Sequence, residues 1–291
     1  MTMNISGETN VYGVIGCPID HTLSPTIQNA AFKALKLNCV LLAFRVASTD
    51  VENALIGMRS LGIRGFNVTM PNKNAVIPYL DEVDETAQIL GSVNTILNED
   101  GKLHGFSTDG AGAHQALEEN GVNLRGKKLV LMGAGGAAKA IAFELAKEVN
   151  ELVVLSRTPG KTDAIWQAIN QKFHKKIRVG TLSSSIIKDA LHNADLLINA
   201  TSVGMNPRPA ESLVKPTWLK PTLTVMDIIY SPLETKLARD ARAAGSKVVS
   251  GLDMLIFQGA ASFEIWTGRP APVEVMRHAA LNQLARGRQQ G

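Results

Sequence analysis

Short apolar runs alternate with amphipathic segments through the first part of the chain. Ser24 followed by Pro25 predicts a helix start, with Ser24 as N-cap and Pro25 at the first helical position. Gly62 stands where the C-cap of the next helix would fall. Apolar runs and helical periodicity together predict strands at 11–15, 40–46 and 66–69 and helices at 24–35 and 51–61. This alternation indicates an α/β layer.

A second alternating series begins near Lys128. Its first apolar run, at 129–132, is continuous, as expected of a strand covered on both faces, and glycines follow at once. The same reasoning predicts strands at 129–132, 152–155, 177–180, 195–199, 223–228 and 247–249, helices at 137–147 and 238–244, and helical structure after Gly251 interrupted by Pro270 and Pro272. We therefore predict an α/β protein of two domains with a cleft between them.

Composition narrows the function classes. The 291 residues are 45% hydrophobic and 19% charged, which suits about two globular domains. The net charge of +4 is small and scattered, so it favours small anionic ligands over nucleic acid. Two cysteines and six histidines show no disulfide or metal-ligand spacing. With neither a leader pattern nor a long apolar run, we expect a cytoplasmic protein with no membrane contact.

The glycine-rich segment between the strand at 129–132 and the following helix fits the dinucleotide pattern GxGxxA. The first glycine allows a tight turn, the second lets the backbone approach a pyrophosphate, and the helix N-terminus offers free N–H groups. A glycine turn without a ligand is the alternative. The residues expected at this phosphate site are Gly133, Ala134, Gly135, Gly136 and Ala137.

The end of the next strand predicts which dinucleotide binds. An NAD site usually has a carboxylate there, whereas this chain has Ser156, Arg157 and Thr158, with Lys161 just beyond. Arg157 can bind a 2′-phosphate in a forked geometry, and the neighbouring hydroxyls can donate hydrogen bonds. The alternative is an ordinary cation at a solvated helix start. We predict NADP as the cofactor.

Small polar clusters recur in the first part of the chain. Each alone is more often a cap or a turn than a site. Together they supply hydroxyls, amides, one lysine and one carboxylate, which suit a polyhydroxylated anion. The clusters are the segments 21–25, 67–73, 91–95 and 107–110.

On these motifs the chain resembles the shikimate dehydrogenase family from about residue 11 to residue 268. The motifs that carry the resemblance are Asn67-Val68-Thr69 with Lys73, Gly91 to Thr95, Thr108-Asp109-Gly110, the Gly133 loop, Asn199-Ala200-Thr201, Asp227 to Pro232, Gly251 to Leu255 and Gln258-Gly259-Ala260. The resemblance implies NADP-linked interconversion of 3-dehydroshikimate and shikimate, on the route to aromatic amino acids. It also implies a substrate domain at 1–110, completed by 251–291, and a Rossmann NADP domain at 111–250.

The resemblance implies roles for individual residues. Lys73 and Asp109 would be the catalytic pair, and hydride transfer to a ketone does create alkoxide character that needs a proton and a nearby positive charge. A structural salt bridge is the alternative for this pair, and the proton route between the two stays open. The residues implied to bind substrate are Thr22, Ser24, Asn67, Thr69, Lys73, Asn94, Asp109, Tyr230 and Gln258, and Gly251 is implied on the cofactor side.

Departures from the family pattern keep other functions open. Thr22 replaces a usual serine beside the substrate carboxylate, where quinate carries an extra hydroxyl, so a quinate/shikimate dehydrogenase that also uses NAD is one alternative. The others are a non-catalytic regulator of the same fold and a Rossmann enzyme acting on another cyclic compound. Ser92, Ser107 and Ser156 are further departures. The sequence leaves a monomer and a homodimer equally open.

Overall fold

The computed structural model describes residues 5–158, 160, 163–175 and 177–287, and its described residues form two compact units. The first unit runs to Thr108 and resumes at Ile256, and the second unit is Asp109–Leu255. The domain boundaries predicted from the sequence, after residue 110 and before residue 251, lie near these divisions. The functions assigned to the two domains remain predictions.

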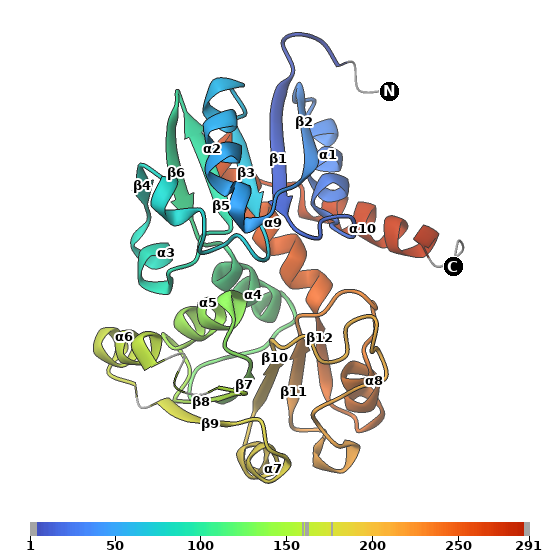
Figure 1. Ribbon diagram of the computed structural model, residues 1–291. Coiled ribbons are helices and arrows are strands. Elements are labelled where there is room, and N and C mark those ends of the chain that lie inside the picture. The colour runs from blue at the N-terminus through green and yellow to red at the C-terminus, as the bar shows by residue number, and fades with distance from the viewer. Residues whose placement is uncertain (1–4, 159, 161–162, 176, 288–291) are drawn as a thin grey trace. The chain divides into compact units, whose positions relative to one another are not determined.

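The first unit is built on a mixed sheet of order β2-β1-β3-β5-β6-β4 (Figure 1). β1 pairs in parallel with β2 and β3, whereas β5 is antiparallel to both β3 and β6. Its strands are β1 (Asn10–Gly16), β2 (Cys39–Arg45), β3 (Gly65–Val68), β4 (Glu82–Val83), β5 (Thr95–Glu99) and β6 (Lys102–Phe106). Its helices are α1 (Ser24–Ala34), α2 (Val51–Ser60), α3 (Glu85–Leu90), most of α9 (Gly251–Thr267) and α10 (Val273–Gly287), with 3₁₀ turns at Ser48–Asp50 and Ile77–Tyr79.

The second unit has a wholly parallel sheet of order β12-β11-β10-β7-β8-β9 among the described residues. Read from β9, this order is 3-2-1-4-5-6, the Rossmann arrangement that the sequence predicted. The chain reverses its direction of winding between β7 and β10, and ligands bind outside the carboxyl ends of the strands at such a point. The strands are β7 (Lys128–Met132), β8 (Glu151–Ser156), β9 (Ile177–Thr181), β10 (Leu196–Asn199), β11 (Thr224–Asp227) and β12 (Lys247–Ser250). The helices are α4 (Asp109–Glu119), α5 (Gly136–Leu145), α6 (Asp163–Phe173), α7 (Ser184–His192) and α8 (Lys236–Ala243), with a 3₁₀ turn at Pro216–Trp218.

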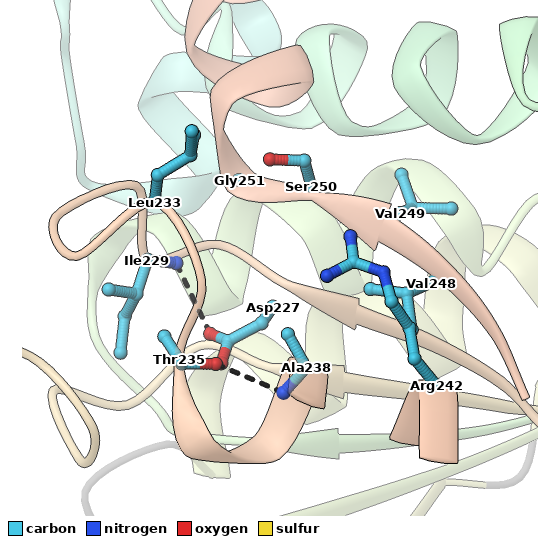
Figure 2. Close-up of a pocket in the computed structure, with 10 residues that line it drawn as sticks. All are labelled: Asp227, Ile229, Leu233, Thr235, Ala238, Arg242, Val248, Val249, Ser250 and Gly251. Atoms are coloured by element: carbon cyan, nitrogen blue, oxygen red, sulfur yellow. Dashed lines mark hydrogen bonds between the residues drawn. The ribbon is translucent and has the colours of Figure 1, made fainter. Parts of the chain in front are cut away.

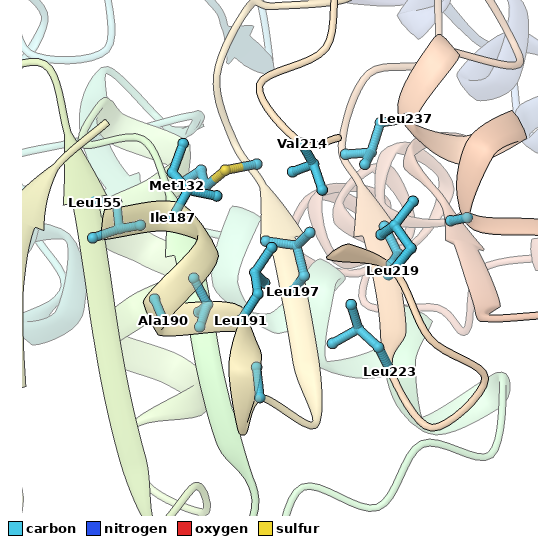
Figure 3. Packing of buried hydrophobic residues seen from close by; sticks show 14 of the residues in the cluster. Met132, Leu155, Ile187, Ala190, Leu191, Leu197, Val214, Leu219, Leu223 and Leu237 are labelled. Atoms are coloured by element: carbon cyan, nitrogen blue, oxygen red, sulfur yellow. The ribbon is translucent and has the colours of Figure 1, made fainter. Parts of the chain in front are cut away.

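Each sheet buries a core of branched aliphatic side chains. In the second unit, Met132 and Leu155 from the sheet pack with Ile187 and Leu191 of α7 (Figure 3). β7, β8 and β10 of this unit are buried along most of their length, which explains their continuous apolar runs. In the first unit, Ile15, Leu55 and Ile96 belong to a separate core of fully buried side chains.

The predicted strands and helices form, with ends shifted by one or two residues in most cases, but one capping prediction is wrong. Leu23 is the N-cap of α1, Ser24 is already helical, and no side chain caps this helix. The hydroxyl of Ser24 is engaged by Thr22 instead, at 3.2 Å between the oxygens. The N-cap residue Leu23 therefore offers no side-chain acceptor, and the Thr22 hydroxyl accepts from Ser24 N–H at 3.2 Å.

Candidate functional site

Lys73 lies on a tight turn that follows β3 and is held on both sides. The buried Asn72 donates from its side-chain amide to the carbonyl of Val46 at 2.9 Å, and its own oxygen accepts from Ser48 at 3.2 Å. The backbone carbonyl of Lys73 accepts from Val93 N–H at 2.9 Å. The turn is thus fixed at Asn72 and at Lys73, and the half-buried lysine side chain extends from a defined backbone.

Asn94, Thr108 and Gln258 form one hydrogen-bonded group in the first unit. The Asn94 amide donates to the Thr108 hydroxyl at 2.8 Å and to Gln258 Oε1 at 3.2 Å, and its oxygen accepts from Thr108 N–H at 2.7 Å. The Thr108 hydroxyl in turn donates to the backbone carbonyl of Gln258 at 3.0 Å. Two residues assigned to substrate by resemblance therefore contact each other directly.

The nitrogen and the oxygen of the Asn67 side chain, near the end of β3, have different surroundings. Its side-chain nitrogen donates to Ser262 of α9 at 3.0 Å. Its side-chain oxygen is buried and has no hydrogen-bond partner within the described part of the chain. A buried acceptor without a donor is costly, so this oxygen suits a ligand hydroxyl. Thr69 follows one residue after β3 and is partly exposed.

Thr22 and Ser24 lie together at the N-terminus of α1. Thr22 Oγ1 also accepts from Ser24 N–H at 3.2 Å. Two hydroxyls beside a helix N-terminus whose N-cap residue makes no side-chain bond form a favourable environment for a carboxylate. His21, which precedes them, is exposed.

Asp109, in the second unit, is the first residue of α4 and is 5% exposed. The next residue, Gly110, is packed so closely on α5 that an added Cβ would lie 2.6 Å from the carbonyl oxygen of Ala140. This contact fixes the start of α4 on α5. The sequence placed residues 107–110 at the end of a strand-like stretch, and the structure shows that the strand ends at Phe106 and that a helix begins at Asp109.

The predicted dinucleotide loop connects β7 to α5 at the reversal point of the parallel sheet. Gly133 has φ +119°, and an added Cβ would lie 2.5 Å from the carbonyl oxygen of Ala200, beyond the end of β10. A Cβ on Gly135 would meet nothing within 4 Å, and Gly135 is an N-cap without a side-chain bond. The loop thus has open space, and no N-cap side chain accepts from the first N–H groups of α5, where a pyrophosphate would bind. Ala134, Gly136 and Ala137 are partly exposed beside it.

The end of β8 fits the adenosine side of a dinucleotide. Ser156 is 3% exposed, and its hydroxyl has no partner among the described residues. Arg157 and Thr158 are exposed. A buried hydroxyl without a partner next to an exposed guanidinium matches a site that a phosphorylated ribose would complete. Lys161 lies outside the described residues.

Beyond β11, a small pocket surrounds the buried carboxylate of Asp227 (Figure 2). Asp227 accepts from Asn199 at 3.0 Å, from the Thr235 hydroxyl at 2.7 Å and from Ile229 N–H at 3.2 Å. Thr235 also caps α8 through Ala238 N–H at 3.1 Å. Burial raises the pKa of Asp227 to about 6, although the three hydrogen bonds lower it.

Gly251 lines this pocket, and Tyr230 directly follows the lining residue Ile229 in the chain. Burial raises the pKa of Tyr230, which is consistent with a phenol that stays protonated. Gly251 lines the pocket, and its Cβ would lie 2.4 Å from the carbonyl carbon of Ile228. Only a residue without a side chain fits there.

Sequence reasoning missed the residues that hold the predicted ones. Asn72 and Ser262 are buried polar side chains with hydrogen-bond partners, whereas Thr108, Asn199 and Asp227 stand in motifs of the resemblance that gave them no role. Asn199 with Asp227 joins the ends of β10 and β11. Buried polarity is invisible in a sequence, although Asn72 and Thr108 do fall inside the polar clusters. Ser262 stands in an apolar helical run and gave no signal.

Two classes of site find no support in the described ranges. No group of three or more histidine, cysteine, aspartate or glutamate side chains there could hold a metal ion. No helix among those residues has both the length and the apolar character needed to span a membrane.

Comparisons with known families cover most of the chain. Residues 14–96 match the shikimate dehydrogenase substrate binding domain, residues 113–229 match the shikimate / quinate 5-dehydrogenase family, and residues 251–281 match the shikimate 5′-dehydrogenase C-terminal domain.

Individual proteins resemble the chain over nearly its whole length. Shikimate dehydrogenase (NADP(+)) of Methanocaldococcus jannaschii is 44% identical over 97% of this chain and 100% of its own. A crystal structure of shikimate dehydrogenase in complex with NADP⁺ has a TM-score of 0.91 at 44% identity, covering 97% of this chain and 98% of that one. Shikimate 5-dehydrogenase from Listeria monocytogenes, in complex with shikimate and NAD, has a TM-score of 0.89 at 37% identity, covering 96% and 98%.

Proposed function

Because this chain belongs to the shikimate dehydrogenase family, we propose that it interconverts 3-dehydroshikimate and shikimate with NADP as the hydride carrier. The proposal places the enzyme on the route to aromatic amino acids. The structural observation that carries it is the hydrogen-bonded group of Asn94, Thr108 and Gln258. Within the first unit, this group joins Asn94 and Gln258, two proposed substrate ligands, to Thr108, the residue that precedes Asp109. The carbonyl of Lys73 accepts from the residue before Asn94.

The proposed chemistry assigns one task to each charged residue. NADPH, when bound, supplies the hydride for the ketone carbon. Lys73 donates a proton to the ketone oxygen as negative charge develops there, and its ammonium group stabilises that charge. Asp109 accepts a hydrogen bond from a substrate hydroxyl. Lys73 then regains its proton from solvent.

Substrate recognition in the proposal uses the polar groups of the first unit. The hydroxyls of Thr22 and Ser24 at the start of α1 receive the ring carboxylate, and their closeness at 3.2 Å beside a helix N-terminus supports this assignment. Asn67, Thr69, Asn94 and Gln258 bind ring hydroxyls, and the buried oxygen of Asn67 supports this assignment. Tyr230, from the second unit, is proposed to contact the substrate.

Cofactor binding in the proposal uses the Gly133 loop and the end of β8. Gly133, Gly135 and the first turn of α5 hold the pyrophosphate, and Ser156 with Arg157 binds the phosphorylated ribose. Thr158 and Lys161 add to the same ribose site, and Gly251 keeps the nicotinamide side open. The first N–H groups of α5, which no N-cap side chain accepts from, and the hydroxyl of Ser156, without a partner among the described residues, support these assignments.

The decisive experiment measures the ultraviolet absorbance of reduced nicotinamide with shikimate or quinate, each combined with NADP or NAD. We expect the highest kcat/KM for shikimate with NADP. Lys73→Ala should lower kcat by about a hundredfold or more while changing substrate affinity far less. Lys102→Ala, an exposed lysine of the same unit, is the control. No turnover by the wild type with any pair, or near-normal turnover by Lys73→Ala, would contradict the proposal.

Quinate in the same assay tests Thr22, whose extra methyl group changes the shape of the proposed carboxylate site. Assembly as a monomer or a homodimer and a cytoplasmic location remain predictions. Light scattering of the purified protein tests the first, and cell fractionation tests the second.

A further inference from the structure

Ser262 joins three elements of the first unit through one hydroxyl group. It lies on α9, is 0% exposed, and contacts β3 through Asn67 at 3.0 Å and β5 through Thr95 at 2.7 Å. Within its own helix it donates to the carbonyl of Gln258, one turn earlier, at 3.0 Å. Although it stands in the middle of an apolar helical stretch, Ser262 thus has polar contacts to two strands as well as to its own helix.

The single proton of Ser262 determines the direction of these hydrogen bonds. A serine hydroxyl has one donor and two acceptor positions. Since the proton is used on Gln258, the oxygen accepts from the Asn67 amide and from the Thr95 hydroxyl. All three positions of Ser262 are then filled by these nearer partners, and the Thr108 hydroxyl lies farther away, at 3.5 Å.

This arrangement fixes the orientation of the Asn67 amide. Its nitrogen faces Ser262, which leaves its oxygen as a buried acceptor with no partner in the described structure. Rotating the amide by half a turn would bring its oxygen against the Ser262 oxygen, whose proton is committed elsewhere. Asn67 therefore offers an acceptor to a ligand, which fits a hydroxyl that donates.

The packing of α9 on the sheet sets the register of this contact. Gly65 lies two residues before Asn67, and a Cβ there would lie 2.4 Å from Nε1 of Trp266. Trp266 Nε1 donates to the carbonyl of Ile96 at 3.0 Å. Two residues of a strand span about 6.6 Å and four residues of a helix span about 6 Å. Trp266 over Gly65 thus brings Ser262 opposite Asn67.

We propose that Ser262 is a positioning residue for substrate: through the Asn67 amide it presents an oxygen acceptor to a donating ring hydroxyl. Ser262 itself touches no substrate atom. The inference rests on the proposed function and extends it to a residue that the family resemblance does not assign.

The first test is Ser262→Ala. With the amide no longer held, the KM for shikimate should rise about five- to tenfold, the cost of one lost hydrogen bond, while kcat and the KM for NADP stay within about twofold. Thr267→Ala is the matched control, because Thr267 makes the same bond to the carbonyl one turn earlier, at 2.8 Å to Phe263, on the same helix and without a contact to Asn67. It should leave both KM values unchanged. Ser262→Cys keeps a weak acceptor of similar size and should give an intermediate KM.

The second test is the double variant with Asn67→Ala. A positioning role predicts that Ser262→Ala adds no further increase in KM once Asn67 is gone. An unchanged KM in Ser262→Ala, or the same increase in both backgrounds, would overturn the inference. If Ser262→Ala has no cooperative thermal transition, Ser262→Cys decides by the same criterion. A wild type inactive on shikimate would instead contradict the proposed function.

Discussion

The side chain of Asn94 makes two hydrogen bonds to Thr108: it donates to the hydroxyl at 2.8 Å and accepts from the backbone N–H at 2.7 Å. Both residues are buried, at 3% and 4% exposure. The next residue along the chain is Asp109, the proposed catalytic carboxylate and the first residue of α4.

Thr108→Val should therefore weaken both stability and catalysis. The change keeps the shape of the side chain but removes one donor and one acceptor among buried groups. The free energy of unfolding should fall by about 1–3 kcal/mol, and kcat/KM should fall several-fold. Urea unfolding and steady-state kinetics measure the two effects. Thr222→Val, at an exposed site, is the control and should change neither the free energy of unfolding nor kcat/KM. If Thr108→Val equals the wild type in both quantities, the hydrogen bonds between Asn94 and Thr108 are dispensable.

Arg157→Asp should weaken NADP binding selectively. The exposed guanidinium is the proposed partner of the 2′-phosphate, and a carboxylate there would repel that group and favour a free ribose hydroxyl. We expect the KM for NADP to rise at least about tenfold and the KM for NAD to fall or stay constant. Arg125→Asp makes the same charge change at another exposed position of the unit. Equal effects of both variants on NADP would point to general charge instead of a specific site.

Gly133→Ala and Gly135→Ala should separate folding from nucleotide binding. The first places a Cβ 2.5 Å from the Ala200 oxygen at φ +119°, so unfolding should become easier by at least about 1–3 kcal/mol. The second meets no atom within 4 Å, so stability should stay near that of wild type while NADPH affinity falls. Thermal melting and fluorescence titration with NADPH measure the two properties. A stable Gly133→Ala protein would contradict the strain argument.

Asp227→Asn should change how stability depends on pH. Burial raises the pKa of Asp227 from 3.8 to about 6, so the folded state holds the proton more tightly than the unfolded state. The contribution of Asp227 to the free energy of unfolding of the wild type is fully present below pH 3.8 and is lost as pH rises through about 6. At about 1.4 kcal/mol per pH unit, the loss relative to Asp227→Asn approaches about 3 kcal/mol. Urea unfolding between pH 4 and pH 7, as a rough window, measures it.

Asp195 provides a control of opposite sign. A hydrogen bond from Lys128 N–H lowers its pKa, so the stability it contributes is present above 3.8 and is lost toward acid. The difference between wild type and Asp195→Asn should therefore grow as pH rises toward 3.8 and stay constant above it, whereas for Asp227 it should shrink as pH rises through about 6, so the titration of this control extends below 3.8. Parallel curves for the two aspartates would show that burial of Asp227 does not control its ionisation.

The sequence by itself determined the α/β class, the Rossmann unit and the location of the glycine loop. These features follow from local patterns: a continuous apolar run for a buried strand, and glycine directly after it for a turn against a phosphate. The resemblance supplied the family and the proposed residues, because several uncommon motifs appear in order.

Tertiary structure alone decided which polar groups are satisfied. Ser262 meets Asn67 across 195 residues of chain, and Asn94 meets Gln258 across 164. No periodic pattern in the sequence indicates either pairing, since each depends on how α9 packs on the sheet. Local patterns specify elements because backbone geometry repeats, whereas hydrogen-bond partners depend on distances that only the packed chain sets.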